Sequence, residues 1–343
     1  MVTILSVDGG GIRGIIPATV LSEVERCTGR PIATLFDLIA GTSTGGILAA
    51  MLTVPDGLGR PYYSAQEALA AYLEHGGAIF RRTPLRQVAT LGGLVRPTYS
   101  PRALERMLDQ YLGQARLHAT LTEILVTAYD MHSATPWFFK TSFAKHHRGP
   151  LNDPLLTQVV RATTAAPTYF PPLSLEDCCL VDGGVFASNP ALCAYAQARN
   201  MYPGERDFLL LSLGTGLQEH ARPCAQVENW GIIKWAVPIS GVMLNASSAT
   251  VDYQLRALLG QQNYLRCQVQ LVGASPDMDD ASPENLRCLA ALGKQAVRQN
   301  EAALNRFCRA LVERDRQPSR QNRANMGNTL HPRPETFISS SLP

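Results

Sequence analysis

Short apolar runs alternate along the chain with segments in which apolar residues recur at helical spacing. A run of strand length followed by a helical stripe, repeated several times, is typical of an α/β protein built on a sheet. The apolar runs predict strands at residues 3–7, 38–41, 124–129, 137–141, 179–181, 208–213 and 264–272. The pattern therefore predicts an α/β fold, with no internal repeat.

The starts of the helices are marked by capping residues. Ser64 and Glu67 have the spacing of a capping box, in which each side chain bonds the other residue's backbone N–H. Ser282 followed by Pro283 places a capping residue ahead of a proline that is favoured at the first helical position. This second signal predicts one long helix running toward Leu311.

Composition and charge narrow the class of protein. The chain has 343 residues, of which 45% are apolar, so it can build a core without disulfides. The net charge is +3, and the excess lies between residue 309 and the end, where six arginines face three acids. We therefore expect one domain over residues 1–308 and a basic, flexible tail over 309–343. A neutral body argues against a nucleic-acid partner.

The cysteines and the uncharged segments of the sequence indicate where in the cell the protein is expected. Eight scattered cysteines without a C-x-x-C pair indicate reduced thiols rather than disulfides or a zinc site. The two longest windows without charge, residues 38–55 and 235–251, are interrupted by glycine, proline or polar side chains, so neither is expected to span a membrane. With no leader visible ahead of the first strand, a cytoplasmic location is expected.

The first of two glycine-rich turns follows the first strand as Asp8-Gly9-Gly10-Gly11-Ile12-Arg13-Gly14. Read as G-x-G-x-x-G, residues 9–14 could bind a dinucleotide, which also requires an acid about 20 residues later, at the end of the second strand. The nearest acid, Asp37, starts that strand instead. Consecutive glycines before a helix more generally present backbone N–H groups to an anion.

The second turn holds the candidate nucleophile. Gly41-Thr42-Ser43-Thr44-Gly45 has the G-x-S-x-G form of a nucleophile elbow, with a strand before it and an apolar helix after it. Glycines flank the serine because bulky neighbours would clash in so sharp a turn. This context favours Ser43 as a nucleophile over an ordinary capping serine.

A serine nucleophile needs a base. Asp182 ends another apolar strand and is followed by Gly183 and Gly184, so its carboxylate is the best-placed candidate. A histidine-dependent α/β-hydrolase using His220 or His331 is the alternative that chain order permits.

These motifs resemble, in order and spacing, the signature blocks of patatin-like phospholipases. Residues 165–172, 212–216 and 279–282 are also similar to segments of that family. The resemblance implies a three-layer α/β/α fold with a central, mostly parallel sheet and a Ser–Asp dyad that works without histidine, metal or cofactor. It places Ser43 as nucleophile, Asp182 as base and the oxyanion site at Gly9, Gly10 and Gly11. Arg13 either supports that loop or a phosphate headgroup, or pairs with a carboxylate that fixes the loop.

The implied activity is a phospholipase A or lysophospholipase acting on membrane lipid esters. An acid-free stretch between residues 75 and 104 carries arginines among apolar residues, which is typical of contact with an anionic lipid surface. We therefore expect peripheral membrane association, with Arg81, Arg82, Arg86 and Arg96 as membrane or lid contacts. Activation by a cyclic nucleotide, as in some family members, and homo-oligomerisation are left open.

Overall fold

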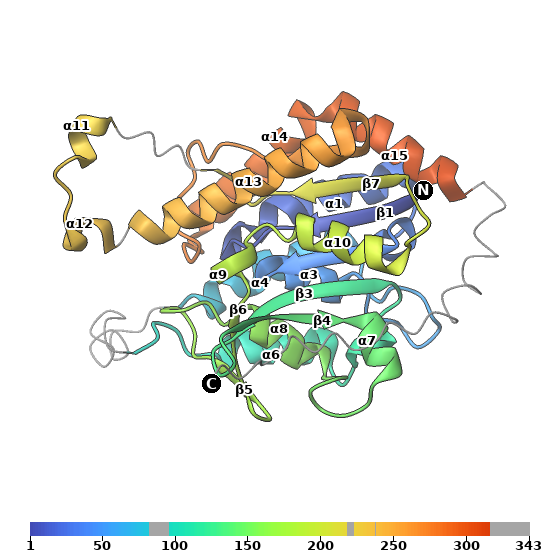
Figure 1. The fold of residues 1–343 in the computed structure, drawn as a ribbon, viewed down its shortest axis with the longest axis horizontal. Coiled ribbons are helices and arrows are strands. Elements are labelled where there is room, and N and C mark those ends of the chain that lie inside the picture. Colours follow the sequence, from blue (N-terminus) through green and yellow to red (C-terminus); the bar gives the residue numbers. More distant parts are fainter. Residues whose placement is uncertain (82–95, 218–222, 237, 316–343) are drawn as a thin grey trace, which may run out of the picture.

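The computed structural model describes residues 1–81, 96–217, 223–236 and 238–315 (Figure 1). In this part of the chain the strands form one eight-stranded sheet in the order β5-β6-β3-β2-β1-β7-β8, and β4 pairs with β3. The strands are β1 (Val2–Val7), β2 (Leu38–Thr42), β3 (Glu123–Asp130), β4 (Thr135–Lys140), β5 (Leu173–Leu175), β6 (Cys178–Asp182), β7 (Phe208–Leu213) and β8 (Tyr264–Cys267). The five strands β3, β2, β1, β7 and β8 are mutually parallel, and β4, β5 and β6 pair in antiparallel fashion.

All seven predicted strands are present, with ends that differ by a few residues. The prediction missed β5, because its three residues are too short to show alternation. It also ran the last strand to residue 272, whereas β8 ends at Cys267. Beyond Cys267 the side chain of Gln268 accepts the N–H of Gly216, and only an isolated bridge joins Gln270 to Leu217.

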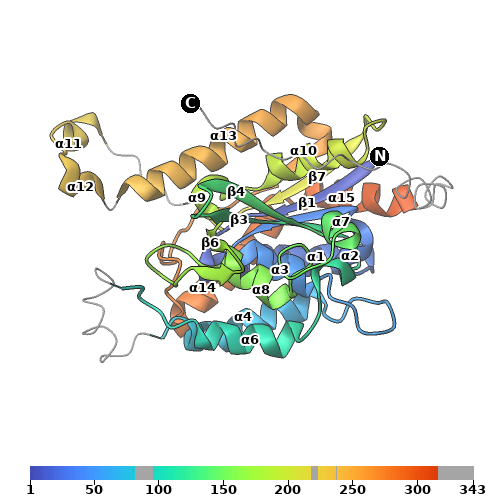
Figure 2. The same cartoon turned by 60° about the horizontal axis from the view of Figure 1, so that its bottom comes forward.

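Helices cover both faces of the sheet, as Figure 2 shows. One layer contains α1 (Ile15–Thr28), α3 (Thr44–Met51), α4 (Ala65–Ile79), α6 (Arg102–Leu112), α8 (Leu156–Thr163), α14 (Pro283–Gln299) and α15 (Glu301–Asp315). The other contains α10 (Ala191–Met201) and α13 (Pro238–Asn263). Shorter helices are α2 (Ile32–Leu35), α7 (Thr141–His146), α9 (Gly184–Ala187), α11 (Cys224–Val227), α12 (Ile232–Ala236) and the 3-10 turns η1 (Gly11–Gly14) and η3 (Leu117–Ala119). The three-layer α/β/α prediction is confirmed.

The layers follow from the side-chain alternation of the central strands. In β1, Leu5 and Val7 pack into the core under α1 and α3, while Val2 and Ile4 point the other way into the core under α10 and α13. Successive side chains of a strand point to opposite faces, so a strand that is apolar at both sets of positions must be covered on both sides. This double burial is why these strands appear in the sequence as continuous apolar runs.

The domain continues past the predicted boundary at residue 308. The single long helix expected from Ser282 is broken at Asn300 into α14 and α15, and α15 runs on to Asp315. Leu311 is fully buried, and Arg314 forms an ion pair with Asp37 ahead of β2. Residues 309–315 therefore belong to the folded body, and the rest of the predicted tail, 316–343, lies outside the described residues.

Three general features complete the fold. None of the helices in the described ranges is long and apolar enough to cross a membrane. The eight cysteines, all within those ranges, are free. No group of three or more histidine, cysteine, aspartate or glutamate side chains among the described residues is arranged to hold a metal ion.

Candidate active site

Ser43 lies in a sharp turn between β2 and α3, as the sequence predicts. Its backbone has φ 54° and ψ −119°, a positive φ that is costly for a residue with a side chain. Two contacts help to hold it there, since the Ser43 N–H donates to Thr163 Oγ1 at 2.8 Å and its carbonyl accepts the N–H of Gly46 at 2.8 Å. The turn leaves the side chain at the amino end of α3, where helix N–H groups favour negative charge.

The flanking glycines are required by close packing. A Cβ on Gly41 would lie 2.2 Å from the carbonyl oxygen of Gly45, and a Cβ on Gly45 would lie 2.1 Å from that of Val7. Backbone atoms cannot move aside as a flexible side chain can, so any larger residue would displace α3 from the sheet. The glycines of the G-x-S-x-G motif are therefore needed because α3 packs closely against β1 and β2.

Strand pairing brings Asp182 close to Ser43. Strand β2 runs parallel to β3 and ends where Thr42 faces Thr127, while β6 runs antiparallel to β3 and ends where Asp182 faces Ala128. Strand β4 occupies the other edge of β3 along residues 125–130, so β2 and β6 must share one edge. The carboxyl ends of β2 and β6 thus meet head to head on β3. Ser43 is the residue directly after β2, so it lies at this junction with Asp182.

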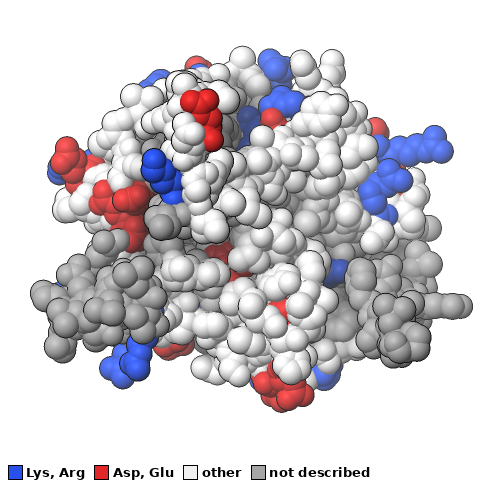
Figure 3. All heavy atoms as spheres, turned by 60° about the vertical axis from the view of Figure 1, so that its left-hand side comes forward, with Lys and Arg blue, Asp and Glu red and all other residues white. Residues whose placement is uncertain are grey.

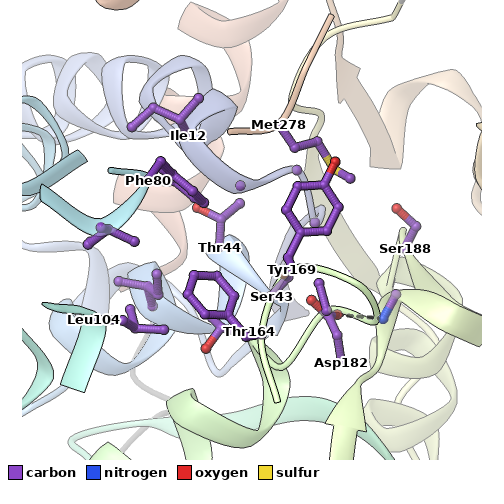
Figure 4. A pocket seen from close by; sticks show the side chains of 18 of the residues that line it. Ile12, Ser43, Thr44, Phe80, Leu104, Thr164, Tyr169, Asp182, Ser188 and Met278 are labelled. Carbon is purple, nitrogen blue, oxygen red and sulfur yellow. Dashed lines mark hydrogen bonds between the residues drawn. The ribbon is translucent and has the colours of Figure 1, made fainter. Parts of the chain in front are cut away.

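Gly183 and Gly184, which follow Asp182, have different structural roles. A Cβ on Gly183 would lie 2.2 Å from Thr127 Oγ1, so this position must be glycine for the turn to sit on β3. The N–H of Gly184 donates to Asp182 Oδ1 at 2.7 Å, which fixes the carboxylate (Figure 4). The Asp-Gly-Gly motif thus packs the turn against β3 and orients the acid.

Asp182 is buried without a cation. No ion pair joins it to any residue in the described part of the chain. Burial raises the pKa of its carboxyl from 3.8 to about 6, and the hydroxyl of Ser43 and the N–H of Gly184 oppose that rise. Its environment is that of a carboxylate able to take up a proton near neutral pH.

The first glycine turn supplies backbone N–H groups to the cavity beside Ser43 and Asp182. Fewer of its glycines have an unoccupied N–H than the sequence predicts. Within the described chain, the N–H groups of Gly10 and Gly11 have no acceptor. The Gly9 N–H donates to the carbonyl of Ser188 at 2.9 Å and is therefore occupied, which corrects the expectation that all three glycines offer donors. Gly11 has φ 59°, and a Cβ there would meet the Met278 carbonyl oxygen at 2.2 Å, so the loop needs glycine.

Arg13 supports this loop from behind. Its Nε donates to the Gly10 carbonyl at 3.3 Å and its Nη1 to the Pro276 carbonyl at 3.4 Å, and its side chain is absent from the described lining of the cavity. These bonds favour support of the loop over contact with a phosphate headgroup, and no ion pair joins Arg13 to a carboxylate among the described residues. Burial lowers the pKa of Arg13 to about 10.

A cavity of about 490 Å³ opens beside these groups (Figure 4). Ser43, Asp182 and the glycine loop form one part of its wall, and the rest is almost wholly apolar. The apolar lining includes Ile12, Ile47, Ile79, Phe80, Leu104, Met107, Phe170, Val185, Met243, Leu244 and Met278. Such a space accepts a hydrocarbon chain with one reactive polar group at the serine end.

The remaining predicted residues divide into two groups. Arg81 and Arg96 are exposed, while Arg82, Arg86, His220 and His331 lie outside the described residues. Among the described residues that line the cavity there is no histidine. The dinucleotide interpretation is weakened because Asp37, its nearest acid candidate, bonds the Thr3 N–H and Arg314 at the end of β1 opposite the glycine turn.

Two residues at the site were missed from the sequence. Thr163, which holds the Ser43 N–H, carries no signal except that it ends the amphipathic helix α8. Arg266 forms an ion pair with Asp8, the residue that begins the glycine loop, and both side chains are buried. The two partners are 258 positions apart in the sequence, so no local pattern could have indicated that they pair.

The fold and site together define an α/β protein with a nucleophile-elbow serine facing a buried carboxylate. A family model described as patatin-like phospholipase matches residues 5–195, and the chain belongs to that family. It is 36% identical to "Probable inactive patatin-3-Kuras 1" of Solanum tuberosum over 369 residues, covering 94% of this chain and 96% of that one. It is 37% identical to "Patatin-like protein 2" of Arabidopsis thaliana over 347 residues, covering 89% and 85%.

Patatin-like phospholipases are a family of lipid acyl hydrolases, although one relative here is named as inactive. A solved structure, VipD from Legionella pneumophila, aligns with a TM-score of 0.39 at 12% identity over 87% of this chain and 67% of that one, too weakly to add to the assignment. Nothing in these matches points to a cyclic nucleotide activator.

Proposed function

We propose that this protein is an active lipid acyl hydrolase that cleaves carboxylic esters of membrane lipids. The observation that carries the proposal is the junction of β2 and β6 on β3, which sets Ser43 against a cation-free, buried Asp182 in an apolar cavity. The unoccupied N–H groups of Gly10 and Gly11 open into the same cavity. Nucleophile, base and oxyanion donors are the minimum set for ester hydrolysis through an acyl-enzyme.

The first half of the reaction forms an ester on the enzyme. Asp182 takes the proton of Ser43 as Oγ attacks the carbonyl carbon of the lipid ester. The Gly10 and Gly11 N–H groups stabilise the resulting oxyanion, and a single donor of this kind lowers a barrier by about 2.7–4 kcal/mol. Collapse of the intermediate breaks the ester bond, and Asp182 returns the proton to the departing alcohol oxygen.

The second half releases the fatty acid. A water molecule loses a proton to Asp182 and attacks acyl-Ser43, the oxyanion forms again in the same site, and Ser43 leaves with the proton. A base with a pKa of about 6 is suited to both steps, since it is ionised at neutral pH yet accepts a proton readily.

The direct test is mass spectrometry of the products formed from vesicles of phosphatidylcholine and phosphatidylglycerol. Wild type should release fatty acid and lysophospholipid, and Ser43→Ala should lower the rate by at least about 10³-fold because the nucleophile is lost. Ser188→Ala is the matched control, because Ser188 lines the same cavity but contributes only its backbone carbonyl to the loop. Hydrolysis by Ser43→Ala at the wild-type rate would refute the assignment.

A further inference from the structure

Helices α11, α12 and the first half of α13 project from the body as an arm (Figures 1 and 2). Along α13, Ile239, Val242 and Met243 have the i, i+3, i+4 spacing of one helix face, and all three are exposed. Ile232 of α12 is 89% exposed. We call these four residues the arm stripe. A helix face with this spacing normally packs into a core, so a stripe left in water needs another partner.

The surroundings of the arm stripe are unusually poor in charge. No charged residue occurs between Trp235 and Val251, and Lys234 is the single charged residue between Trp230 and that window. Figure 3, which brings this end of the molecule forward, shows a broad surface with few charged side chains. An interface with a water-soluble protein usually has a polar rim, whereas a surface that enters lipid does not need one.

The arm stripe is continuous with the substrate cavity. Met243 is 63% exposed and also lines the cavity, and its neighbour Leu244 lines it too. Val185 of α9 is another lining residue with a large exposed fraction, 47%. The apolar surface outside and the apolar wall inside therefore meet at the cavity mouth.

Two exposed cationic side chains adjoin these apolar residues along the chain. Arg81 is exposed and directly follows Phe80, a lining residue at the end of α4, and Lys234 is exposed on the arm itself. Apolar residues flanked by lysine and arginine are the pattern of a surface that sits in the headgroup region of an anionic bilayer.

We propose that the arm stripe inserts into the acyl region of a phospholipid surface and lets a lipid chain enter the cavity without crossing water. The proposal rests on the proposed function, because it assumes that the cavity takes a lipid chain. A phospholipid surface fits better than a second copy of this chain. A copy seated on the stripe would cover Met243 and with it the mouth, whereas a membrane would itself supply the substrate.

The arm carries its own reporters for the first test. Trp230 and Trp235 pack edge to face, and only one other tryptophan, Trp137 on β4, is present. Vesicles of phosphatidylcholine and phosphatidylglycerol with brominated acyl chains should quench the fluorescence of the wild type. They should no longer do so in Trp230→Phe/Trp235→Phe. Binding to the vesicles without quenching would show that another surface makes the contact and would overturn the proposal.

The second test removes the apolar contact. Ile232→Ser/Ile239→Ser/Val242→Ser should weaken vesicle binding by roughly tenfold or more, since interfacial binding scales with buried apolar area. Hydrolysis of a short, monomeric ester should stay at the wild-type rate, which shows that the variant is folded. Leu58→Ser/Tyr253→Ser/Leu258→Ser is the matched control, because those three apolar side chains are also exposed but lie elsewhere.

The outcomes of these tests distinguish membrane docking from contact between copies and from failure of the proposed function. Equal loss of binding in both triple variants, or no loss in the first, would overturn the proposal. So would a lipid-free wild-type dimer that the first triple variant converts to a monomer, because the stripe would then be a contact between copies. Ser43→Ala should bind vesicles as wild type does. If it also hydrolysed lipid as wild type does, the proposed function would fail while the result on docking stood.

Discussion

Asp8 and Asp182 look alike in the sequence and play opposite parts in the structure. Each lies at the carboxyl end of an apolar strand and is buried, with 4% and 5% of its surface exposed. Three glycines follow Asp8 and two follow Asp182. Burial raises the pKa of both carboxyls, but the guanidinium of Arg266 opposes the rise at Asp8, whereas only a hydroxyl and an N–H do so at Asp182. A buried carboxylate with a cation holds structure together, and one without a cation is poised to accept a proton.

The sheet explains which acid receives the cation. Ser6 of β1 pairs with Ser212 of β7, and Ser212 pairs with Arg266 of β8. Arg266 Nη1 donates to Ser212 Oγ at 2.7 Å and to Asp8 Oδ1 at 2.9 Å, so the arginine reaches across β7 to the end of β1. Asp182 ends β6, which lies end to end with β2 on one edge of β3, on the other side of β1 from β7 and β8. The different positions in the sheet therefore separate a structural acid from a candidate base.

The largest expected effect is at the paired acid. Asp8→Asn should lower the free energy of unfolding by about 3–5 kcal/mol, because it leaves the buried Arg266 without its counter-charge. Urea denaturation would measure the change. The double variant Asp8→Asn/Arg266→Met should recover much of the loss, and a double variant no more stable than the single one would show that the two residues do not act as a pair.

The same substitution at the unpaired acid should have the opposite sign. A pKa raised from 3.8 to about 6 means that the folded state binds the proton more tightly, so stability falls as pH rises through that range. Asp182→Asn removes this cost and should raise the free energy of unfolding at pH 7 by about 1–3 kcal/mol while abolishing hydrolysis.

Urea denaturation at several pH values would check the sign at Asp182. The gain should shrink below pH 6 and vanish below about pH 4, where Asp182 is protonated in both the folded and the unfolded chain. A destabilised Asp182→Asn at pH 7 would mean that a cation shares the site after all.

The smallest effect is on the rate. If Asp182 is the base, kcat/KM for a monomeric ester should fall about tenfold for each pH unit below 6, a change of about 1.4 kcal/mol per unit. Ser188→Ala should keep the same profile, since it leaves the Asp182 environment intact. A profile that stays flat down to pH 4 would contradict the assignment of the pKa to the catalytic base.

Much of the site could be predicted because its motifs report local backbone geometry. Gly41 and Gly45 appear in the sequence because Cβ atoms there would strike backbone oxygens, and a strand, a serine and a small apolar helix leave few other conformations for Ser43. The details that the sequence missed or left open depend on contacts that it does not show. Gly9 loses its N–H to Ser188, and Arg13 turns to the carbonyls of Gly10 and Pro276, neither of which any spacing in the sequence indicates.

The sequence by itself determined every strand except β5, the elbow at Ser43 and the strand-end position of Asp182, because periodicity and glycine sterics act over a few residues. Only the tertiary structure decided that β6 meets β2 head to head on β3, that Arg266 neutralises Asp8 and leaves Asp182 alone, and that α15 continues to Asp315. Only it showed that the first part of the charge-free window, with Ile239, Val242 and Met243 exposed, belongs to an arm that reaches the cavity. These outcomes depend on which distant segments the sheet brings together, and short-range patterns carry no record of that.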